Sequence, residues 1–142
     1  YLHLIYILKD KTMSKKATIN IEEKIASNRY SNIKYRVTYE LKEYWEREDF
    51  IRWFVNKEKK CCYCLCSAEE LNKFYDLNSS KRKSTRGKSL EIERIEDKEY
   101  SENNCELSCY WCNNAKSDVF TYEEFKNIGK SIGEVIRNKI NK

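Results

Sequence analysis

Apolar side chains recur at helical spacing in two long segments of the chain. Residues 46–57 carry one such face behind an acidic first turn, and residues 121–140 carry a longer face behind a Thr–Glu capping box. The first face consists of Phe50, Ile51, Phe54 and Val55. The second consists of Tyr122, Phe125, Ile128, Ile132, Val135 and Ile136. Both segments are therefore predicted to be amphipathic helices, the second ending near residue 140, with Gly129 and Gly133 on a side that another backbone can approach closely.

Capping residues predict two further helices. Asn20 followed by Glu23 is a capping box that opens a helix near residue 21. Ser67 stands at an N-cap position with Glu70 three residues on, so a short helix is expected over residues 67–75.

Alternation of apolar and polar residues predicts a pair of strands. Residues 90–95 alternate in this way, and a turn leads to a second expected strand near 105–108. Residues 35–41 also alternate, yet the same stretch fits a helical stripe and no Gly or Pro decides between the two. We interpret it as a helix that ends in a short extended piece.

Composition and charge narrow the class of protein. The chain has 142 residues with 40% hydrophobic and 13% aromatic content, which excludes low-complexity disorder, and the absence of Pro favours helices. The net charge of +5 is unevenly spread: residues 81–90 hold five cations and no acid, whereas residues 91–102 hold six acids and two cations. A basic loop followed by an acidic strand suits a polyanionic partner held near a cation site.

Three segments are expected along the chain. Residues 1–12 precede Met13 and are interpreted as upstream read-through or a poorly ordered tail. Residues 13–60 form a mainly helical region, and residues 61–142 form the domain that contains the chemistry. The apolar run at the start of the chain spans only eight residues, too few for a membrane helix, so no membrane partner and an intracellular location are expected.

The seven cysteines indicate a metal site. Cys61 and Cys64 form one C-x-x-C pair, and Cys109 and Cys112 form another. An odd total without a signal peptide favours metal in a reducing compartment over disulfides. Four thiolates complete a tetrahedral shell for a structural Zn²⁺. The other three, which are Cys62, Cys66 and Cys105, are expected to be packing residues, although Cys62 or Cys66 could replace a member of the first pair.

Three stretches together resemble the HNH (ββα-metal) nucleases, especially short phage-type members with zinc knuckles. They are "CCYC" at 61–64, "LEIERIEDKEYSENNCELSCYWCNNAKSD" at 90–118 and "FTYEEFKNIG" at 120–129. The resemblance covers residues 46–136 and is specific from 90 to 129. It implies an α+β fold in which a β-hairpin and a helix surround one divalent cation that binds the scissile phosphate of DNA.

The resemblance also assigns roles to individual residues. Glu93 corresponds to the metal-binding acid, Asn104 to the Asn that pins the hairpin loop, and Asn113 to the second metal ligand. Lys116, one helical turn beyond Asn113, would face the phosphate. Carboxylate and amide oxygens are hard ligands that suit Mg²⁺ or Mn²⁺, and two protein ligands leave positions for phosphate and water.

Arg94 departs from the family pattern. It stands where the family has the His that activates water, and an arginine cannot accept a proton at physiological pH. The chain's single His is His3, in the first segment. Glu96 or Glu91 could be the base, water activated by the cation could lose its proton to bulk solvent, or catalysis could be lost while DNA binding remains. Arg94 would in each case be able to clamp a phosphate.

Each of these assignments has a plainer alternative. Glu93 could be a solvated strand residue, Asn113 a helix N-cap, and Asn104 an ordinary turn residue. Trp45, Trp53 and Trp111 are expected in the core. The basic cluster would contact phosphates or form a solvated loop; it consists of Lys81, Arg82, Lys83, Arg86 and Lys88.

The sequence as a whole predicts an α+β, treble-clef-like ββα-metal domain closed by a long C-terminal helix. The predicted function is metal-dependent HNH-type DNA endonuclease, as monomer or homodimer, that nicks or cuts duplex DNA. The alternatives are a zinc-stapled DNA-binding module without catalysis and, less favoured, a zinc scaffold for protein contacts.

Overall fold

The computed structural model describes residues 21–33, 45–77 and 87–142. The chain divides into two compact units, Tyr1–Lys57 and Glu58–Lys142. Residues 35–41, for which the sequence left helix and strand open, lie outside the described residues, as does the expected tail at 1–12. Within the described part of the chain, no helix is long and apolar enough to cross a membrane.

The first unit is held together by aromatic side chains. Residues 21–33 are helical, and α3 spans Arg47–Asn56, within the predicted 46–57. The ring centroids of Tyr30 and Phe50 lie 5.5 Å apart, and Trp45 packs edge-on against Phe50 and Trp53. The Tyr30 hydroxyl donates to the Trp45 carbonyl at 2.9 Å, so the polar end of this buried tyrosine is satisfied. Trp45 and Trp53 are buried, as predicted for core residues.

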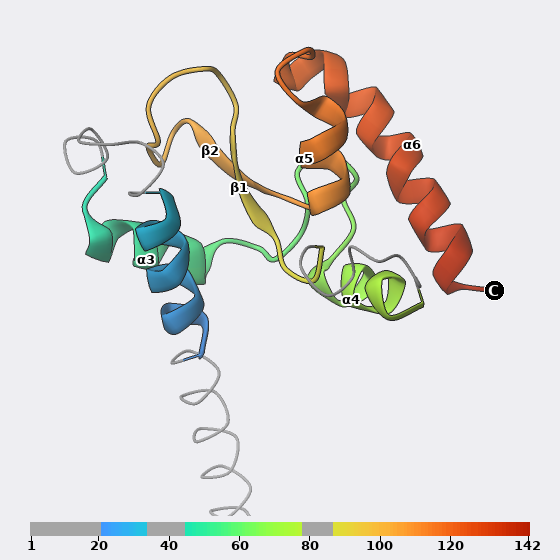
Figure 1. The fold of residues 1–142 in the computed structure, drawn as a ribbon, viewed down its shortest axis with the longest axis horizontal. Helices are drawn as coiled ribbons and strands as arrows, with labels where there is room; N and C mark the ends of the chain where they lie inside the picture. Colours follow the sequence, from blue (N-terminus) through green and yellow to red (C-terminus); the bar gives the residue numbers. More distant parts are fainter. Residues whose placement is uncertain (1–20, 34–44, 78–86) are drawn as a thin grey trace, which may run out of the picture. The chain divides into compact units, whose positions relative to one another are not determined.

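The second unit combines a two-stranded sheet with helices. Its elements in chain order are α4 (Ala68–Leu77), β1 (Glu91–Arg94), β2 (Cys105–Ser108), α5 (Tyr110–Lys116) and α6 (Tyr122–Ile140). The strands are antiparallel, with Glu91 opposite Ser108 and Glu93 opposite Glu106. Figure 1 shows α5 directly after β2, with α6 running alongside it. The prediction of an α+β domain with a β-hairpin and a long C-terminal helix is confirmed.

Capping boxes fix the starts of α4 and α6, whereas Asn20, from the box predicted to open a helix near residue 21, lies outside the described residues. Ser67 Oγ accepts from the Glu70 amide at 3.1 Å, and Glu70 returns the bond by accepting from the Ser67 amide at 2.8 Å. Thr121 and Glu124 form the same reciprocal pair at the start of α6. Each box satisfies two backbone N–H groups that have no partner inside the helix.

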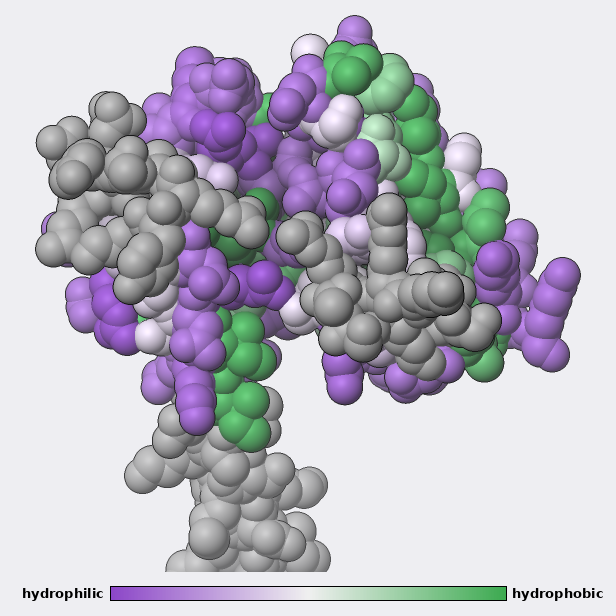
Figure 2. Space-filling view, viewed as in Figure 1, coloured by the Kyte–Doolittle hydropathy of each residue, from purple (hydrophilic) through white to green (hydrophobic). Residues whose placement is uncertain are grey.

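Two glycines let α6 approach the loop that holds the first cysteine pair. A Cβ at Gly129 would overlap Tyr63, and a Cβ at Gly133 would overlap the carbonyl of Cys64. Helix α6 therefore packs backbone to backbone against residues 61–66, as the spacing of the glycines predicted. Ile128 and Val135 of the same helix are exposed, and Figure 2 shows hydrophobic side chains following this helix.

Candidate metal centre and active site

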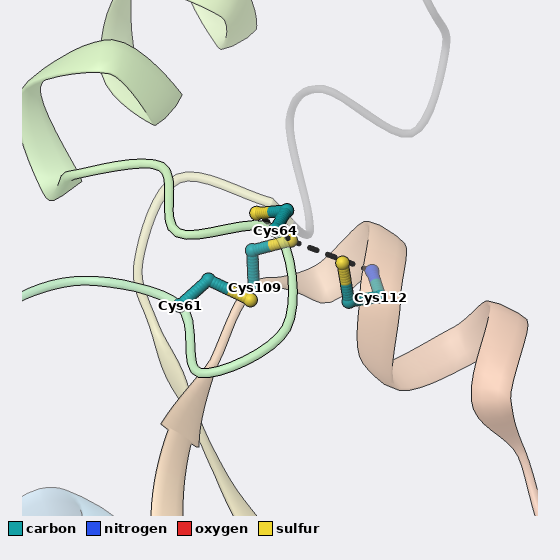
Figure 3. Close-up of side chains that lie close together, drawn as sticks. All are labelled: Cys61, Cys64, Cys109 and Cys112. Carbon is teal, nitrogen blue, oxygen red and sulfur yellow. Dashed lines mark hydrogen bonds between the residues drawn. The ribbon is translucent and has the colours of Figure 1, made fainter. Parts of the chain in front are cut away.

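The four predicted zinc cysteines meet at one point. Cys61 and Cys64 come from the loop before α4, Cys109 follows β2, and Cys112 lies in the first turn of α5 (Figure 3). All four are buried, and their sulfur atoms lie within 4.8 Å of one another. The Cys109 sulfur also caps α5 by accepting from the Cys112 amide at 3.4 Å.

The spacing of these sulfurs fits a tetrahedral metal. Four thiolates about 2.3 Å from one zinc stand about 3.8 Å apart at the corners of a tetrahedron. The sulfurs of Cys64 and Cys109 are 3.8 Å apart, far beyond a disulfide bond, and all seven cysteines are free. The cluster can hold a metal ion.

The remaining cysteines lie outside the cluster. Cys66 is fully buried, and its thiol lies 3.9 Å from the Gly133 carbonyl. Burial raises the pKa of Cys105 to about 12, so this thiol stays protonated at neutral pH. Neither Cys62 nor Cys66 is among the four whose sulfurs converge.

The second candidate site lies on one face of the β-hairpin. Because side chains alternate along a strand and direct cross-strand partners share a face, Glu91, Glu93, Glu106 and Ser108 project to the same side. Helix α5 contacts β1. Only 5% of the Glu93 residue surface is exposed, whereas its neighbour Ile92 is half-buried. The fold therefore covers Glu93, just as it covers Cys105 and Leu107 on the other face of the hairpin, which argues against the alternative of a solvated Glu93.

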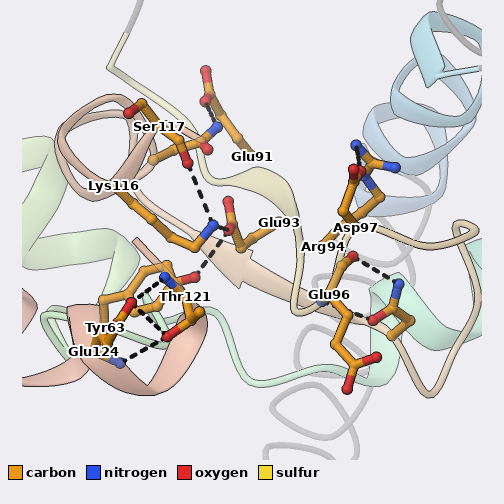
Figure 4. Close-up of polar contacts among 12 residues, drawn as sticks. Tyr63, Glu91, Glu93, Arg94, Glu96, Asp97, Lys116, Ser117, Thr121 and Glu124 are labelled. Atoms are coloured by element: carbon orange, nitrogen blue, oxygen red, sulfur yellow. Dashed lines mark hydrogen bonds and ion pairs between the residues drawn. The ribbon is translucent and has the colours of Figure 1, made fainter. Parts of the chain in front are cut away.

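Glu93 accepts two bonds on the same oxygen. The Tyr63 hydroxyl donates to Glu93 Oε1 at 2.9 Å, and Lys116 Nζ lies 3.0 Å from that atom (Figure 4). The Lys116 and Glu93 side chains are only 12% and 6% exposed. Burial and the Glu93 carboxylate raise the pKa of Tyr63, so the phenol remains a donor at neutral pH. Among the described residues both partners bind Oε1, so Oε2 is the oxygen open to a cation.

Asn113 faces the same strand from α5. Its Nδ2 donates to Glu91 Oε2 at 2.6 Å. The structure therefore places Asn113 against Glu91 and Lys116 against Glu93, two residues that share one face of β1. The N-cap of α5 is Cys109, which rules out the plainer alternative of an N-cap role for Asn113.

The donor set on this face fits a hard divalent cation. The oxygens come from a carboxylate and a carboxamide, which suit Mg²⁺ or Mn²⁺ better than a thiophilic metal. Ser108 Oγ adds a fully buried hydroxyl on the same face, with no hydrogen-bond partner among the described residues. A buried polar atom of this kind is usually satisfied by a ligand or by water.

Asn104 fastens the loop between the two strands. Its Oδ1 accepts from the Glu96 amide at 3.0 Å, and its Nδ2 donates to the carbonyls of Glu96 and Glu99 at 3.2 and 2.8 Å. These bonds span the turn of the hairpin, which matches the structural role that the resemblance assigns to Asn104.

Arg94 and Glu96 lie away from the acid-bearing face. As neighbours along β1, Glu93 and Arg94 point to opposite sides. The Arg94 guanidinium lies 3.1 Å from Asp97, donates to the Lys98 carbonyl at 2.8 Å and stacks over Tyr100. Figure 4 shows Arg94 and Glu96 apart from Lys116. The structure thus does not bring either residue to Glu93.

The basic cluster is described only at its end. Lys81, Arg82, Lys83 and Arg86 lie outside the described residues, and Lys88 is exposed. Gly87, with a φ of +100°, sits against the rings of Tyr75, Tyr110 and Trp111. Only a glycine adopts this backbone conformation without strain. Trp111, predicted to be a core residue, is half-buried and packs edge-on against Phe74.

Sequence reasoning did not place Tyr63 and Ser108 in the candidate site, and it considered Glu91 as a base without predicting its contact with Asn113. No local pattern shows that the Tyr63 hydroxyl reaches a carboxylate 30 residues away. A signal did exist for Glu91: it stands two residues before Glu93 on a predicted strand, so the two must share a face. The position of Ser108 on the same face as Glu91 could be known only from the register of the two strands.

Comparison with known proteins extends these observations. No protein-family model and no curated protein matches the sequence. Among solved structures, the chain is similar to the rare-cutting HNH restriction endonuclease PacI, with a TM-score of 0.59 and 24% identity over 78% of each chain. The resemblance to HNH endonucleases seen in the sequence is therefore confirmed at the level of the fold, and the chain combines the fold of an HNH nuclease with a four-cysteine cluster that can hold a metal ion.

Proposed function

We propose that the protein is a metal-dependent endonuclease that hydrolyses phosphodiester bonds of DNA, with a structural Zn²⁺ on the four cysteines. The observation that carries this proposal is the placement of Glu93 and Asn113 on facing elements beside the cysteine cluster. Cys112 and Asn113 are consecutive in α5, so a zinc ion that fixes the start of this helix also fixes the second candidate ligand of Mg²⁺ or Mn²⁺.

The residues around Glu93 have distinct tasks in this proposal. A cation held by Glu93 and Asn113 would polarise the scissile phosphate and activate water. Tyr63 holds the Glu93 carboxylate in place through its hydroxyl. Lys116 supplies positive charge at the same carboxylate and, in contact with DNA, would offer that charge to the phosphate.

Arg94 supports a second candidate function, a zinc-stapled DNA-binding module without catalysis. It cannot act as a base, and its guanidinium is engaged by Asp97 on the other face of β1. Glu91, another carboxylate on the same face as Glu93, is occupied by Asn113. Loss of a general base typically slows a reaction about 10²–10⁴-fold, so slow cleavage is compatible with this geometry.

Cleavage of supercoiled plasmid with Mg²⁺ or Mn²⁺ tests the first proposal. The unsubstituted protein is expected to give nicked or linear DNA, and Glu93→Gln is expected to abolish this product while preserving the Tyr63 hydrogen bond. Glu102→Gln is the matched control, because Glu102 is an exposed acid in the hairpin loop. Salt-dependent DNA binding without cleavage would replace the nuclease by the binding module, and absence of DNA binding would leave the protein-contact scaffold.

A further inference from the structure

We propose that Glu91 is a positioning residue that fixes which end of the Asn113 carboxamide faces the cation site. The inference rests on the proposed function, because it concerns the second ligand of the same divalent cation. It assigns to Glu91 a task different from that of a base or a metal ligand.

The contact that carries the proposal is short and joins two rigid elements. Asn113 Nδ2 lies 2.6 Å from Glu91 Oε2, and both residues are half-buried. Glu91 is held by its pairing with Ser108. Ser108 ends β2 and Cys109 caps α5, so strand β2 runs directly into helix α5. The distance between Glu91, which is paired with β2, and Asn113 on α5 therefore has little freedom.

The chemistry of the two groups makes this contact directional. A carboxamide has an oxygen that can bind a metal and an NH₂ group that cannot. An ionised carboxylate only accepts hydrogen bonds, so it must take the NH₂ end of Asn113. The amide oxygen is then directed away from Glu91 and remains available as a ligand. Partners that orient a ligand in this way typically change metal affinity about 10–100-fold when they are removed.

The neighbouring asparagine shows why the partner matters. Asn114 is exposed, and its Nδ2 donates to the carbonyl of Tyr110, one turn back in the same helix, at 2.7 Å. Its amide is therefore tied to its own helix. Of the two consecutive asparagines, only Asn113 is oriented by a group on β1.

Mn²⁺ binding to the zinc-loaded full chain provides the test, measured from the electron paramagnetic resonance signal of free Mn²⁺. Glu91→Ala and Glu91→Gln both remove the charge, but Gln retains an oxygen that can accept from Asn113. The ratio of the two Mn²⁺ dissociation constants therefore measures the effect of the hydrogen bond to Asn113, separately from the effect of the lost charge. We expect Glu91→Ala to bind Mn²⁺ at least about 5-fold more weakly than Glu91→Gln. The same pair is then compared in the Asn113→Ala background, where the ratio should fall to about one.

Each alternative gives a different result. A ratio near one with Asn113 present would overturn the proposal, since Glu91 would then contribute only charge or a tether between strand and helix. An equal, large ratio in both backgrounds would also overturn it, because residue 91 would then bind the metal directly. Zinc content and melting temperature establish that each variant is folded.

The proposed nuclease function can fail independently. If the two ratios behave as expected but plasmid is never cleaved, the positioning role stands and the nuclease proposal falls. If plasmid is cleaved in a Glu93-dependent manner while the ratio is one, the nuclease proposal stands and the role of Glu91 falls. Absence of Mn²⁺ binding to the unsubstituted protein would overturn the positioning role together with the cation site.

Discussion

The ion pair between Lys116 and Glu93 allows a quantitative test of how the site is built. We consider Lys116→Met, which keeps a long side chain and removes the ammonium group. The side chains are 12% and 6% exposed, so the substitution would leave a carboxylate buried without its countercharge. Removing one partner of a buried ion pair typically lowers the unfolding free energy by about 3–5 kcal/mol. Because Tyr63 still donates to Glu93, we expect a loss near the lower end, about 3 kcal/mol.

An exposed pair elsewhere in the same unit is the matched control. Lys73 and Glu69 on α4 are 2.9 Å apart, close to the 3.0 Å of the buried pair, but their side chains are 61% and 79% exposed. Lys73→Met should therefore lower the unfolding free energy far less than Lys116→Met does, as expected for an exposed pair one helical turn apart. The comparison holds the substitution and the bond length constant, so burial is the main difference.

Urea unfolding of zinc-loaded protein at neutral pH, followed by circular dichroism, measures both effects. The double variant Glu93→Gln with Lys116→Met should recover much of the loss, because it leaves no buried charge. The loss in Lys116→Met should also persist at high salt, which screens exposed pairs far more than buried ones. Equal destabilisation by Lys116→Met and Lys73→Met would refute the reasoning that burial makes this pair important.

Two further predictions concern the cysteine cluster and the helix that packs on it. Removal of metal by a chelator should unfold the second unit, because the four buried thiols and the start of α5 would lose the ion that joins them. A circular dichroism spectrum that chelation leaves unchanged would contradict this prediction. Gly133→Ala should destabilise the protein by up to about 2 kcal/mol. Overlap of the added Cβ with the Cys64 carbonyl costs about 1–3 kcal/mol, and the higher helix propensity of Ala offsets about 1 kcal/mol of that cost. Thermal unfolding beside Glu134→Ala, at an exposed neighbouring position, measures this effect, and a higher melting temperature for Gly133→Ala would show that no close approach exists.

The sequence by itself determined the local elements and the metal cluster. The positions of α3, α4 and α6 followed from apolar spacing and from caps such as Ser67 and Thr121, because helix formation depends on residues close in the chain. The two C-x-x-C pairs predicted their own convergence, since four thiolates at this spacing have few other stable uses. Asn113 and Glu93 became candidate ligands through the resemblance that these motifs support.

Only the tertiary structure decided which side chains share the site. The register of the hairpin placed Ser108 opposite Glu91, and packing of the knuckle brought the Tyr63 hydroxyl to Glu93. Such contacts join residues far apart in the chain, so no local pattern encodes them. Arg94 is the instructive exception: it follows Glu93 on a predicted strand, and alternation alone places it on the opposite face. The resemblance suggested a shared site for the two residues, whereas the geometry of the strand separates them.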